Sequence, residues 1–479
     1  MPTSAGKEIP LHRPSFSHNY SDFIGIGDNG HLWMDGCDCA ELAKSFGTPL
    51  YVMSEAQLRH NYRRFRDAFA AAYDDVEILF ANKSNNGLAI RHIMNQEGAG
   101  GDCFGYNEMY LALLAGSDPS KMALNGSNKE PAEIELAVAN GVCVNIDAMD
   151  ELDMIEETAR RLDRETHVGI RVKLELPDLK DHHSTGVHHG AMPDIVRHEK
   201  WGMTYDQSIE LVKRIQNSSA DLELHELHFH LSRLDNQAEA FALMARDMVR
   251  WAAKLNDDTG WAAPCIDLGG GWTFGRKEKT GPRGGVDDER VSSYEAFGRE
   301  VGLAVKDECE KLNFPLPTLR IEPGRAISGT AGIAIGEVGA IKDWPEKGLK
   351  WVNLNLSGNH VPWITIPHHY HIVPVNKAAA APKETVDIVG PICTHDILGR
   401  SREMPELVRG DLIAMLDTGC YAESLAANFN AQCKPATVLV SGDTAEVITE
   451  RERLTDVIGR FRVPARLLGA SQALHGVPH

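Results

Sequence analysis

Short apolar runs alternate with longer amphipathic stretches through the central part of the chain. The runs have the length and composition of buried strands, and apolar residues in the stretches between them recur at helical spacing. Eight strand-then-helix units lie between about Ser54 and Thr330, a span that suits the roughly 250 residues usual for a (β/α)8 barrel, the TIM barrel. The predicted strands are Val76–Ala81, Gly101–Phe104, Met122–Leu124, Val142–Ile146, His167–Val172, Leu224–Phe229, Cys265–Leu268 and Leu319–Ile321, and the clearest helices are Glu130–Asn140, Ala148–Leu162, Tyr205–Gln216 and Ala238–Leu255.

The pattern changes after Ser328, where helical periodicity fades and short strand-like runs are separated by turn residues. We therefore predict a barrel at residues 49–330 and a C-terminal antiparallel β-domain at residues 331–479. The alternation at Gly30–Met34 suggests that the N-terminal segment, residues 1–48, packs with this β-domain. The predicted strands of the second domain are Ile333–Ala340, Trp351–Leu356, Asp411–Leu416, Thr437–Val440 and Thr444–Ile448.

The charge of the chain restricts its partners. At pH 7 the formal net charge is −19, so nucleic acids and anionic membrane surfaces would repel the protein. No apolar stretch approaches the roughly 18 residues that a membrane span needs, and residues 1–10 lack the pattern of a secretory signal. The nine cysteines are scattered without metal-binding spacing, as expected of reduced thiols in the cytoplasm. A small molecule remains the expected substrate.

Reactive side chains gather where the predicted barrel strands end. Active sites of TIM barrels form at these C-terminal strand ends. Lys83 follows the first strand, although a single lysine is more often an ordinary surface residue. His228 and His230 end the sixth strand and face the same side of it; such an imidazole can stack on an aromatic cofactor or be a hydrogen-bonded core histidine. Other strand ends carry Asp102, Asn125, Asp147 and Arg171.

The last two strands end in residues suited to an anion and to a ring nitrogen. The glycines at 269–271 would let backbone N–H groups approach a phosphate, although such a run can also be a simple turn. Glu322 can hold a proton on a pyridine nitrogen, and Arg325 suits a phosphate or a carboxylate. Together with a lysine for a Schiff base and a stacking histidine, these residues predict pyridoxal 5'-phosphate (PLP) as cofactor.

Longer motifs around these positions resemble the fold-type III PLP-dependent decarboxylases, the family that contains the diaminopimelate, ornithine and arginine decarboxylases. FANKSN, GAGGDCFGYNEMYLALLAG, HFH, DLGGG and EPGR resemble its cofactor-binding segments, and GPIC and DTGCY resemble motifs of its second domain. The resemblance covers about residues 48–456 and is greatest to the diaminopimelate decarboxylases. It implies decarboxylation of an amino acid by a head-to-tail homodimer with two shared active sites.

The resemblance also implies a role for individual residues. Lys83 would carry the cofactor, Glu322 would keep its ring nitrogen protonated, and Cys393 of the neighbouring subunit would protonate the α-carbon after CO₂ has left. The further cofactor-binding residues that it implies are Asp102, Arg171, His230, Gly269, Gly270, Gly271, Arg325 and Tyr421, with Glu108 near them.

The chain departs from the family pattern where the substrate's side chain is recognised. Diaminopimelate decarboxylases follow the cysteine with Glu-Ser, and ornithine decarboxylases use an aspartate there, whereas this chain has Thr394 and His395. A second segment, which elsewhere carries a charged substrate contact, contains His360 and Trp363. These four residues are the expected substrate contacts, and we expect an unusual amino acid as substrate.

Several alternatives remain open on the sequence alone. An amino-acid racemase is less favoured because alanine-type racemases place arginine against the ring nitrogen, and a non-catalytic PLP carrier would lack the second domain. Histidines at 182–189 and 368–371 could suggest a metal, but adjacent histidines on a strand point to opposite faces, and we predict no metal site. The long polar segment at residues 178–200 is expected to be a loop and could act as a lid over the site.

Overall fold

A closed barrel of eight parallel strands is the larger of two domains in the structure, a computed structural model that describes residues 23–184, 190–231, 237–273, 292–362 and 371–467. The predicted (β/α)8 barrel is confirmed, and each strand begins and ends within two residues of its predicted bounds. Around the barrel the strands are β12 (Leu222–His228), β13 (Cys265–Asp267), β14 (Thr318–Ile321), β5 (Val76–Ala81), β6 (Gly100–Phe104), β7 (Met122–Asn125), β8 (Cys143–Ile146) and β9 (Thr166–Arg171).

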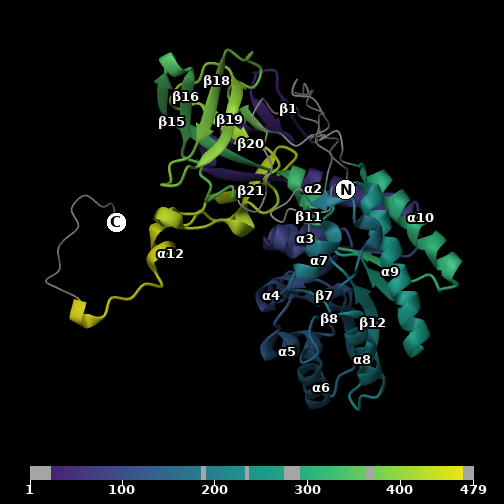
Figure 1. The fold of residues 1–479 in the computed structure, drawn as a ribbon. Coiled ribbons are helices and arrows are strands. Elements are labelled where there is room, and N and C mark those ends of the chain that lie inside the picture. The colour runs from purple at the N-terminus through teal and green to yellow at the C-terminus, as the bar shows by residue number, and fades with distance from the viewer. Residues whose placement is uncertain (1–22, 185–189, 232–236, 274–291, 363–370, 468–479) are drawn as a thin grey trace, which may run out of the picture.

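Helices surround the barrel strands and bury their apolar faces against them (Figure 1). Local sequence sets where they begin and end: the hydroxyl of Ser54 accepts the backbone N–H of Gln57 at the start of α2, and Gly141 adopts the left-handed conformation (φ +78°) at the end of α5. The four predicted helices are present as α5, α6, α8 and α9. The helices are α2 (Glu55–Ala70), α3 (Leu88–Gln96), α4 (Tyr106–Leu114), α5 (Pro131–Asn140), α6 (Glu151–Leu162), α8 (Tyr205–Gln216), α9 (Ala238–Thr259), α10 (Tyr294–Leu312) and the single turn α11 (Arg325–Ser328).

The second domain is a nine-stranded sheet whose pairs are mostly antiparallel, as predicted, although β16 pairs with β18 and β4 with β21 in parallel. Residues 50–54 fall inside the range predicted for the barrel, yet they form β4, which pairs with β15 and β21 of this sheet. Every residue of β4 is buried, so its sequence lacks the alternation that marks a two-faced sheet. The strands are β4 (Leu50–Ser54), β15 (Gly332–Trp344), β16 (Leu349–Leu354), β17 (Ile372–Pro374), β18 (Glu384–Val389), β19 (Ile397–Met404), β20 (Leu412–Met415), β21 (Ala436–Ser441) and β22 (Thr444–Thr449).

The described part of the N-terminal segment lies against the second domain. It forms a small sheet of its own, and its apolar residues share a core with those of β4, β15 and β21. The backbone N–H of Leu32 also donates to the carbonyl of Val375 at 2.8 Å. Its elements are β1 (Ile24–Ile26), β2 (Leu32–Met34), β3 (Cys37–Asp38) and α1 (Cys39–Phe46).

The segment at residues 178–200, expected to be a loop, contains regular structure. β10 (His183–Ser184) pairs with β11 (Gly190–Ala191), and α7 (Met192–His198) buries the side chain of Met192 completely. A hairpin and a helix were not predicted because they are too short to show a periodic pattern. The lid remains a prediction. Residues 185–189 and 368–370, with most of the histidines considered for a metal, lie outside the described residues.

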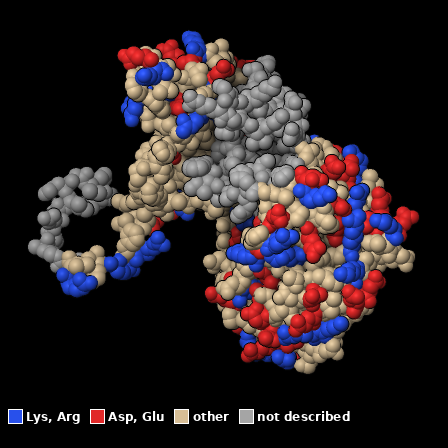
Figure 2. Space-filling model, in the orientation of Figure 1, with Lys and Arg blue, Asp and Glu red and all other residues tan. Residues whose placement is uncertain are grey.

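The surface carries both signs of charge. Figure 2 shows acidic and basic side chains interspersed over the barrel, without a continuous basic patch on the face in view. Among the described residues no helix is both long and apolar enough to cross a membrane. After β22 the chain continues through α12 (Leu454–Ile458), which projects away from both domains (Figure 1).

Candidate active site

A cavity of about 400 Å³ opens at the C-terminal ends of the barrel strands. This is the place where TIM barrels form their active sites, because every strand end contributes a side chain there. A polar and partly aromatic lining surrounds it, contributed by Lys83, Asp102, Phe104, Glu108, Asn125, Arg171, Trp201, His228, His230 and Glu322.

Lys83 projects into this cavity from the turn that follows β5. Its ammonium group pairs with the carboxylate of Asp102, which is buried at the end of β6. Burial alone would lower the pKa of Lys83, but the negative charges of Asp102 and Glu322 outweigh it and raise the pKa above its usual value. The amine is therefore held charged and in place when the cavity contains no cofactor.

Asn125 joins the two carboxylates of the site. Its side-chain nitrogen donates to Oδ1 of Asp102 at 2.9 Å and to Oε1 of Glu322 at 2.6 Å, and its oxygen accepts from Asn145 at 2.9 Å. Burial would raise the pKa of Glu322, but the adjacent histidines, His228 first, hold it well below its usual range. Glu322 is therefore a buried, ionised carboxylate that can hold a proton on a ring nitrogen.

A hydrogen bond joins His230 to the glycine loop after β13. The backbone N–H of Gly270 donates to Nδ1 of His230 at 2.8 Å, which fixes the plane of the imidazole beside the cavity. A Cβ on Gly270 would approach the carbonyl oxygen of Glu322 to 2.8 Å and Cε1 of His230 to 2.9 Å, so only glycine fits there. Gly269 and Gly271 have φ of +64° and +94°, which also favour glycine.

Arg171 is buried beside the cavity, and two side chains lie next to its guanidinium. Its guanidinium lies 3.8 Å from Oδ1 of Asp147 and 5.0 Å from the centre of the Trp201 ring. The carboxylate of Asp147 also accepts the backbone N–H of Gly202 at 2.9 Å. Asp147 thereby connects Arg171 to the segment that carries Trp201.

Glu108 approaches the site from α4. Its carboxylate accepts the backbone N–H of Phe104 at 2.7 Å. Burial is the main cause that raises the pKa of Glu108 to about 7, with a further contribution from the charge of Asp102. Glu108 therefore changes charge near neutral pH beside the cavity.

The second domain reaches the site through Tyr421. Its backbone N–H donates to the carbonyl of Ser84 at 2.8 Å, and its ring packs under the guanidinium of Arg325 at 5.1 Å. The ammonium of Lys83 is close enough to oppose the burial that raises the pKa of the Tyr421 phenol. The structure therefore brings Tyr421, Arg325 and Lys83 together, as the sequence analysis expects.

The expected substrate contacts do not line the cavity of their own chain. Cys393, Thr394 and His395 are exposed on the loop between β18 and β19, where Asn430 donates to the sulfur of Cys393 at 3.4 Å. His360 is only 2 % exposed, and its backbone carbonyl accepts the hydroxyl of Tyr51. Trp363 lies outside the described residues.

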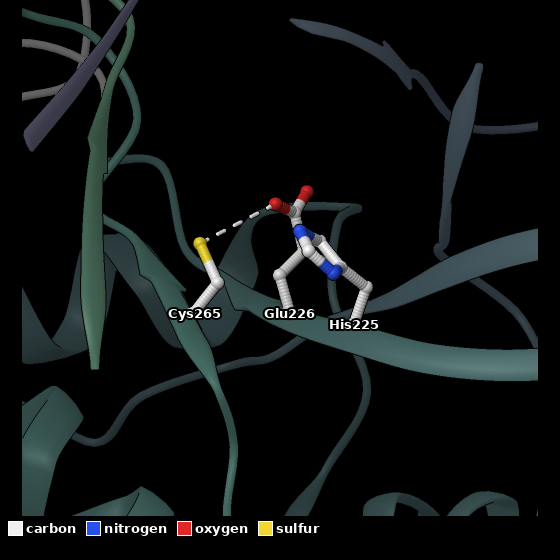
Figure 3. Close-up of side chains that lie close together, drawn as sticks. All are labelled: His225, Glu226 and Cys265. Carbon is white, nitrogen blue, oxygen red and sulfur yellow. Dashed lines mark hydrogen bonds between the residues drawn. The ribbon is translucent and has the colours of Figure 1, made fainter. Parts of the chain in front are cut away.

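A second group of side chains with metal-binding atoms lies on the barrel strands β12 and β13 (Figure 3). His225 and Glu226 come from β12 and Cys265 comes from β13, and its thiol donates to Glu226 at 3.8 Å. However, Glu226 already binds the guanidinium of Arg320 at 2.6 Å, which supplies the positive charge that a buried carboxylate needs. This cluster is explained by an ion pair.

The arrangement at the cavity fits PLP. A lysine amine, an ionised glutamate, an imidazole held edge-on to a glycine loop, and nearby arginines match in number and chemistry the groups that bind an aldehyde, a pyridine nitrogen, an aromatic ring and a phosphate. Barrel, site and second domain together define the class of fold-type III PLP-dependent enzymes.

Comparison with known proteins identifies the family. Residues 55–329 match the family model "Pyridoxal-dependent decarboxylase, pyridoxal binding domain". A diaminopimelate decarboxylase of Methanothermobacter thermautotrophicus is 30% identical over 93% of this chain and 99% of its own length, and one of Staphylococcus aureus is 30% identical over 91% and 98%. A crystal structure of diaminopimelate decarboxylase from Methanocaldococcus jannaschii superposes with a TM-score of 0.83 at 28% identity, covering 94% of this chain and 100% of that one. The chain belongs to the pyridoxal-dependent decarboxylases: it is an amino-acid decarboxylase with PLP as cofactor.

Three residues of the cavity received no role from the sequence. Asn125 ends a predicted strand, so its position was a signal, but nothing in the sequence showed that it would face two carboxylates. Phe104 also ends a strand, beside Glu108. Trp201 left no signal, because it reaches the cavity from an irregular segment without periodicity.

Proposed function

We propose that the protein is a homodimeric decarboxylase of an α-amino acid whose far end carries no free ammonium group. The proposal rests on the loop between β18 and β19. Asp396, the only acidic residue in the stretch from Gly390 to Asp396, is 2 % exposed, and its carboxylate accepts the backbone N–H groups of Gly358 and Ile392 at 2.7 and 3.1 Å. That carboxylate is therefore engaged within its own chain and cannot pair with a substrate ammonium.

Each residue around the cavity has a separate role in the proposed reaction. PLP supplies the electron sink that accepts the electrons of the bond to the departing carboxylate. Lys83 would hold the cofactor covalently, and Glu322 would keep a proton on the ring nitrogen because the carboxylate itself stays ionised. His230, which the glycine loop orients, would stack on the ring, the glycines at 269–271 with Arg325 would hold the phosphate, and Tyr421 would contribute to the site from the second domain.

Cys393 acts in the cavity of a second subunit. It is exposed in its own chain, and the exposed loop offers a thiol, a hydroxyl and an imidazole in Cys393, Thr394 and His395. The thiol would donate the proton to the α-carbon after CO₂ has left. Thr394 and His395 would contact the far end of the substrate. These neutral or weakly basic groups suit a hydrogen-bonding or anionic side chain.

The absence of disulfides among the nine cysteines, all of which lie in the described residues, supports a cytoplasmic location.

Release of CO₂ from the PLP-loaded protein, measured on a panel of L- and D-amino acids, tests the function. The panel includes diaminopimelate, lysine, ornithine, arginine, glutamate and amino acids with amidated or acylated side chains. We expect release from a substrate without a distal ammonium, and none from the Lys83→Ala protein. A rate on diaminopimelate that exceeds all others would contradict the substrate proposal while leaving the decarboxylase in place.

Diaminopimelate itself is the second candidate substrate. The observation that favours it is the similarity to proteins named diaminopimelate decarboxylase over more than nine-tenths of the chain. The same panel decides between the two candidates.

Mixing two inactive variants tests the shared site. Lys83→Ala and Cys393→Ala proteins are combined under conditions that exchange subunits. If each site uses Lys83 from one chain and Cys393 from the other, random exchange restores about a quarter of the wild-type sites. No recovery, with exchange verified by mass spectrometry, would show that both residues act within one chain.

A further inference from the structure

The C-terminal arm, residues 453–467, extends away from the body of the molecule as the yellow end of the ribbon in Figure 1. It contains α12 and a short turn at Ala465–Leu467. Hydrogen bonds between Arg453 and Asp456, and from Arg462 to the carbonyls of Gly459 and Phe461, hold it internally. These hydrogen bonds all lie within the arm itself.

Apolar side chains of the arm are exposed to water. The exposed fractions are 53 % for Leu454, 46 % for Ile458, 62 % for Phe461, 59 % for Val463 and 59 % for Leu467. Single exposed apolar residues are normal, but five within fifteen residues of one projecting segment form a surface that water does not favour. We therefore expect these side chains to be covered by another protein surface.

The arm begins next to the loop that carries Cys393. At its base, Glu452 accepts hydrogen bonds from the side chain of Asn428 at 2.6 Å and from the backbone N–H of Lys434 at 2.9 Å. Asn430, in the same segment, contacts the sulfur of Cys393, and Phe429 between them is 48 % exposed. The base of the arm and the loop that carries Cys393 are thus connected through the segment from Asn428 to Lys434 and lie on the same surface of the protein.

We infer that the C-terminal arm docks on a second copy of this chain, beside that copy's active-site cavity. The inference rests on the homodimer proposed above, in which Cys393 enters the neighbouring cavity and brings the base of the arm with it. Charge also favours a second copy of the chain as the partner. Three arginines, Arg460, Arg462 and Arg466, are the only charged residues between 457 and 467, so this part of the arm is positively charged. The whole chain carries a net charge of −19 and would attract it.

A matching surface lies on α4, directly after the cavity residue Phe104. Tyr106, Tyr110 and Leu114 recur every four residues along one face, are 38 %, 50 % and 59 % exposed, and the two tyrosine rings stack with centroids 6.2 Å apart. Apolar side chains of the arm can cover this stripe, and arginine guanidinium groups pack well on tyrosine rings. The stripe is the receiving surface.

Sedimentation velocity of the PLP-loaded protein over a concentration series tests the inference. The arm variant is Ile458→Glu with Phe461→Glu, the receiving variant is Tyr110→Glu, and the control is Leu316→Glu, an equally exposed apolar residue (61 %) before β14. We expect the dimer dissociation constant to rise at least tenfold in the first two variants and to stay unchanged in the control, with unaltered thermal unfolding of the isolated subunits. Deleting residues 454–479 should have the same effect as the arm variant.

The outcomes separate the two proposals. A wild-type chain that stays monomeric at every concentration refutes the homodimer and the docking together. A dimeric wild type whose dissociation constant is unchanged in the arm variant and in the deletion overturns the docking alone. A weakened arm variant with an unchanged Tyr110→Glu protein overturns α4 as the receiving surface.

Discussion

Asn125 and Glu322 lie 197 positions apart in the chain, and a 2.6 Å hydrogen bond joins the side-chain amide of the first to Oε1 of the second. The same amide donates to Asp102, the partner of Lys83. One neutral donor thus positions both the anion beside the lysine and the anion that we propose for the ring nitrogen.

Asn125→Ala should reduce kcat roughly tenfold to a hundredfold with a smaller change in KM, because a hydrogen bond to a charged group contributes about 1.5–3 kcal/mol. The cofactor's absorbance spectrum should also change its pH dependence, since Glu322 loses its donor. Asn125→Asp should be worse, because it adds a third carboxylate. Asn140→Ala, on the exposed end of α5, is the control, and a spectrum unchanged in Asn125→Ala would contradict the positioning role.

Glu108 should make stability depend on pH. Its pKa is about 7 in the folded protein, above that of an ordinary glutamate, so the folded state binds a proton more tightly than the unfolded state. This contribution to stability is complete below about pH 4.5 and is lost as the pH rises through 7. Glu108→Gln stays neutral, and the cofactor-free variant should be more stable than wild type by about 1–3 kcal/mol at pH 8 and equally stable near pH 4.

Denaturant unfolding at several pH values measures this difference. For the control Glu310→Gln, at an exposed glutamate of α10, the stability difference from wild type should not change with pH. Parallel pH profiles for wild type and Glu108→Gln would rule out the raised pKa.

Arg320→Met should destabilise the barrel strongly. The guanidinium binds Glu226, whose carboxylate is completely buried, and removing the cation leaves an unpaired charge at a cost of about 3–5 kcal/mol. Arg320 keeps the pKa of Glu226 below its usual value against the effect of burial, so this stability is present near neutral pH and is lost as the pH falls through the folded pKa.

Thermal unfolding at pH 7 should show the loss. The double variant Arg320→Met with Glu226→Leu should recover most of it, because no charge remains buried. A single variant as stable as wild type would mean that the ion pair contributes nothing to the barrel.

His230→Phe should weaken PLP binding several-fold while keeping an aromatic ring in place. The phenyl ring cannot accept the N–H of Gly270, which leaves a buried donor unpaired at about 1–3 kcal/mol. Fluorescence titration of cofactor-free protein with PLP measures the dissociation constant, with the exposed His198→Ala as control. An unchanged constant would show that the glycine loop does not need the imidazole.

Local patterns predicted the elements well where one period dominates. Tyr205–Gln216 was predicted to the residue, because a capping threonine and a clear apolar face define it. β4 could not be placed from its sequence, since a fully buried strand of either domain shows the same apolar run. The paired strands and the helix within residues 178–200 were missed because two strand residues and two helical turns are too short to show a repeating pattern.

The sequence by itself determined the barrel and predicted the cofactor from the residues at the strand ends. Strand periodicity and the chemistry at strand ends are local properties, and a parallel barrel necessarily gathers those ends at one rim. Only the tertiary structure decided that Asn125 bonds Glu322, that Asp396 is engaged within its own loop, and that β4 joins the second sheet. These are contacts between segments far apart in the chain, and they depend on distances and directions that a one-dimensional pattern does not contain.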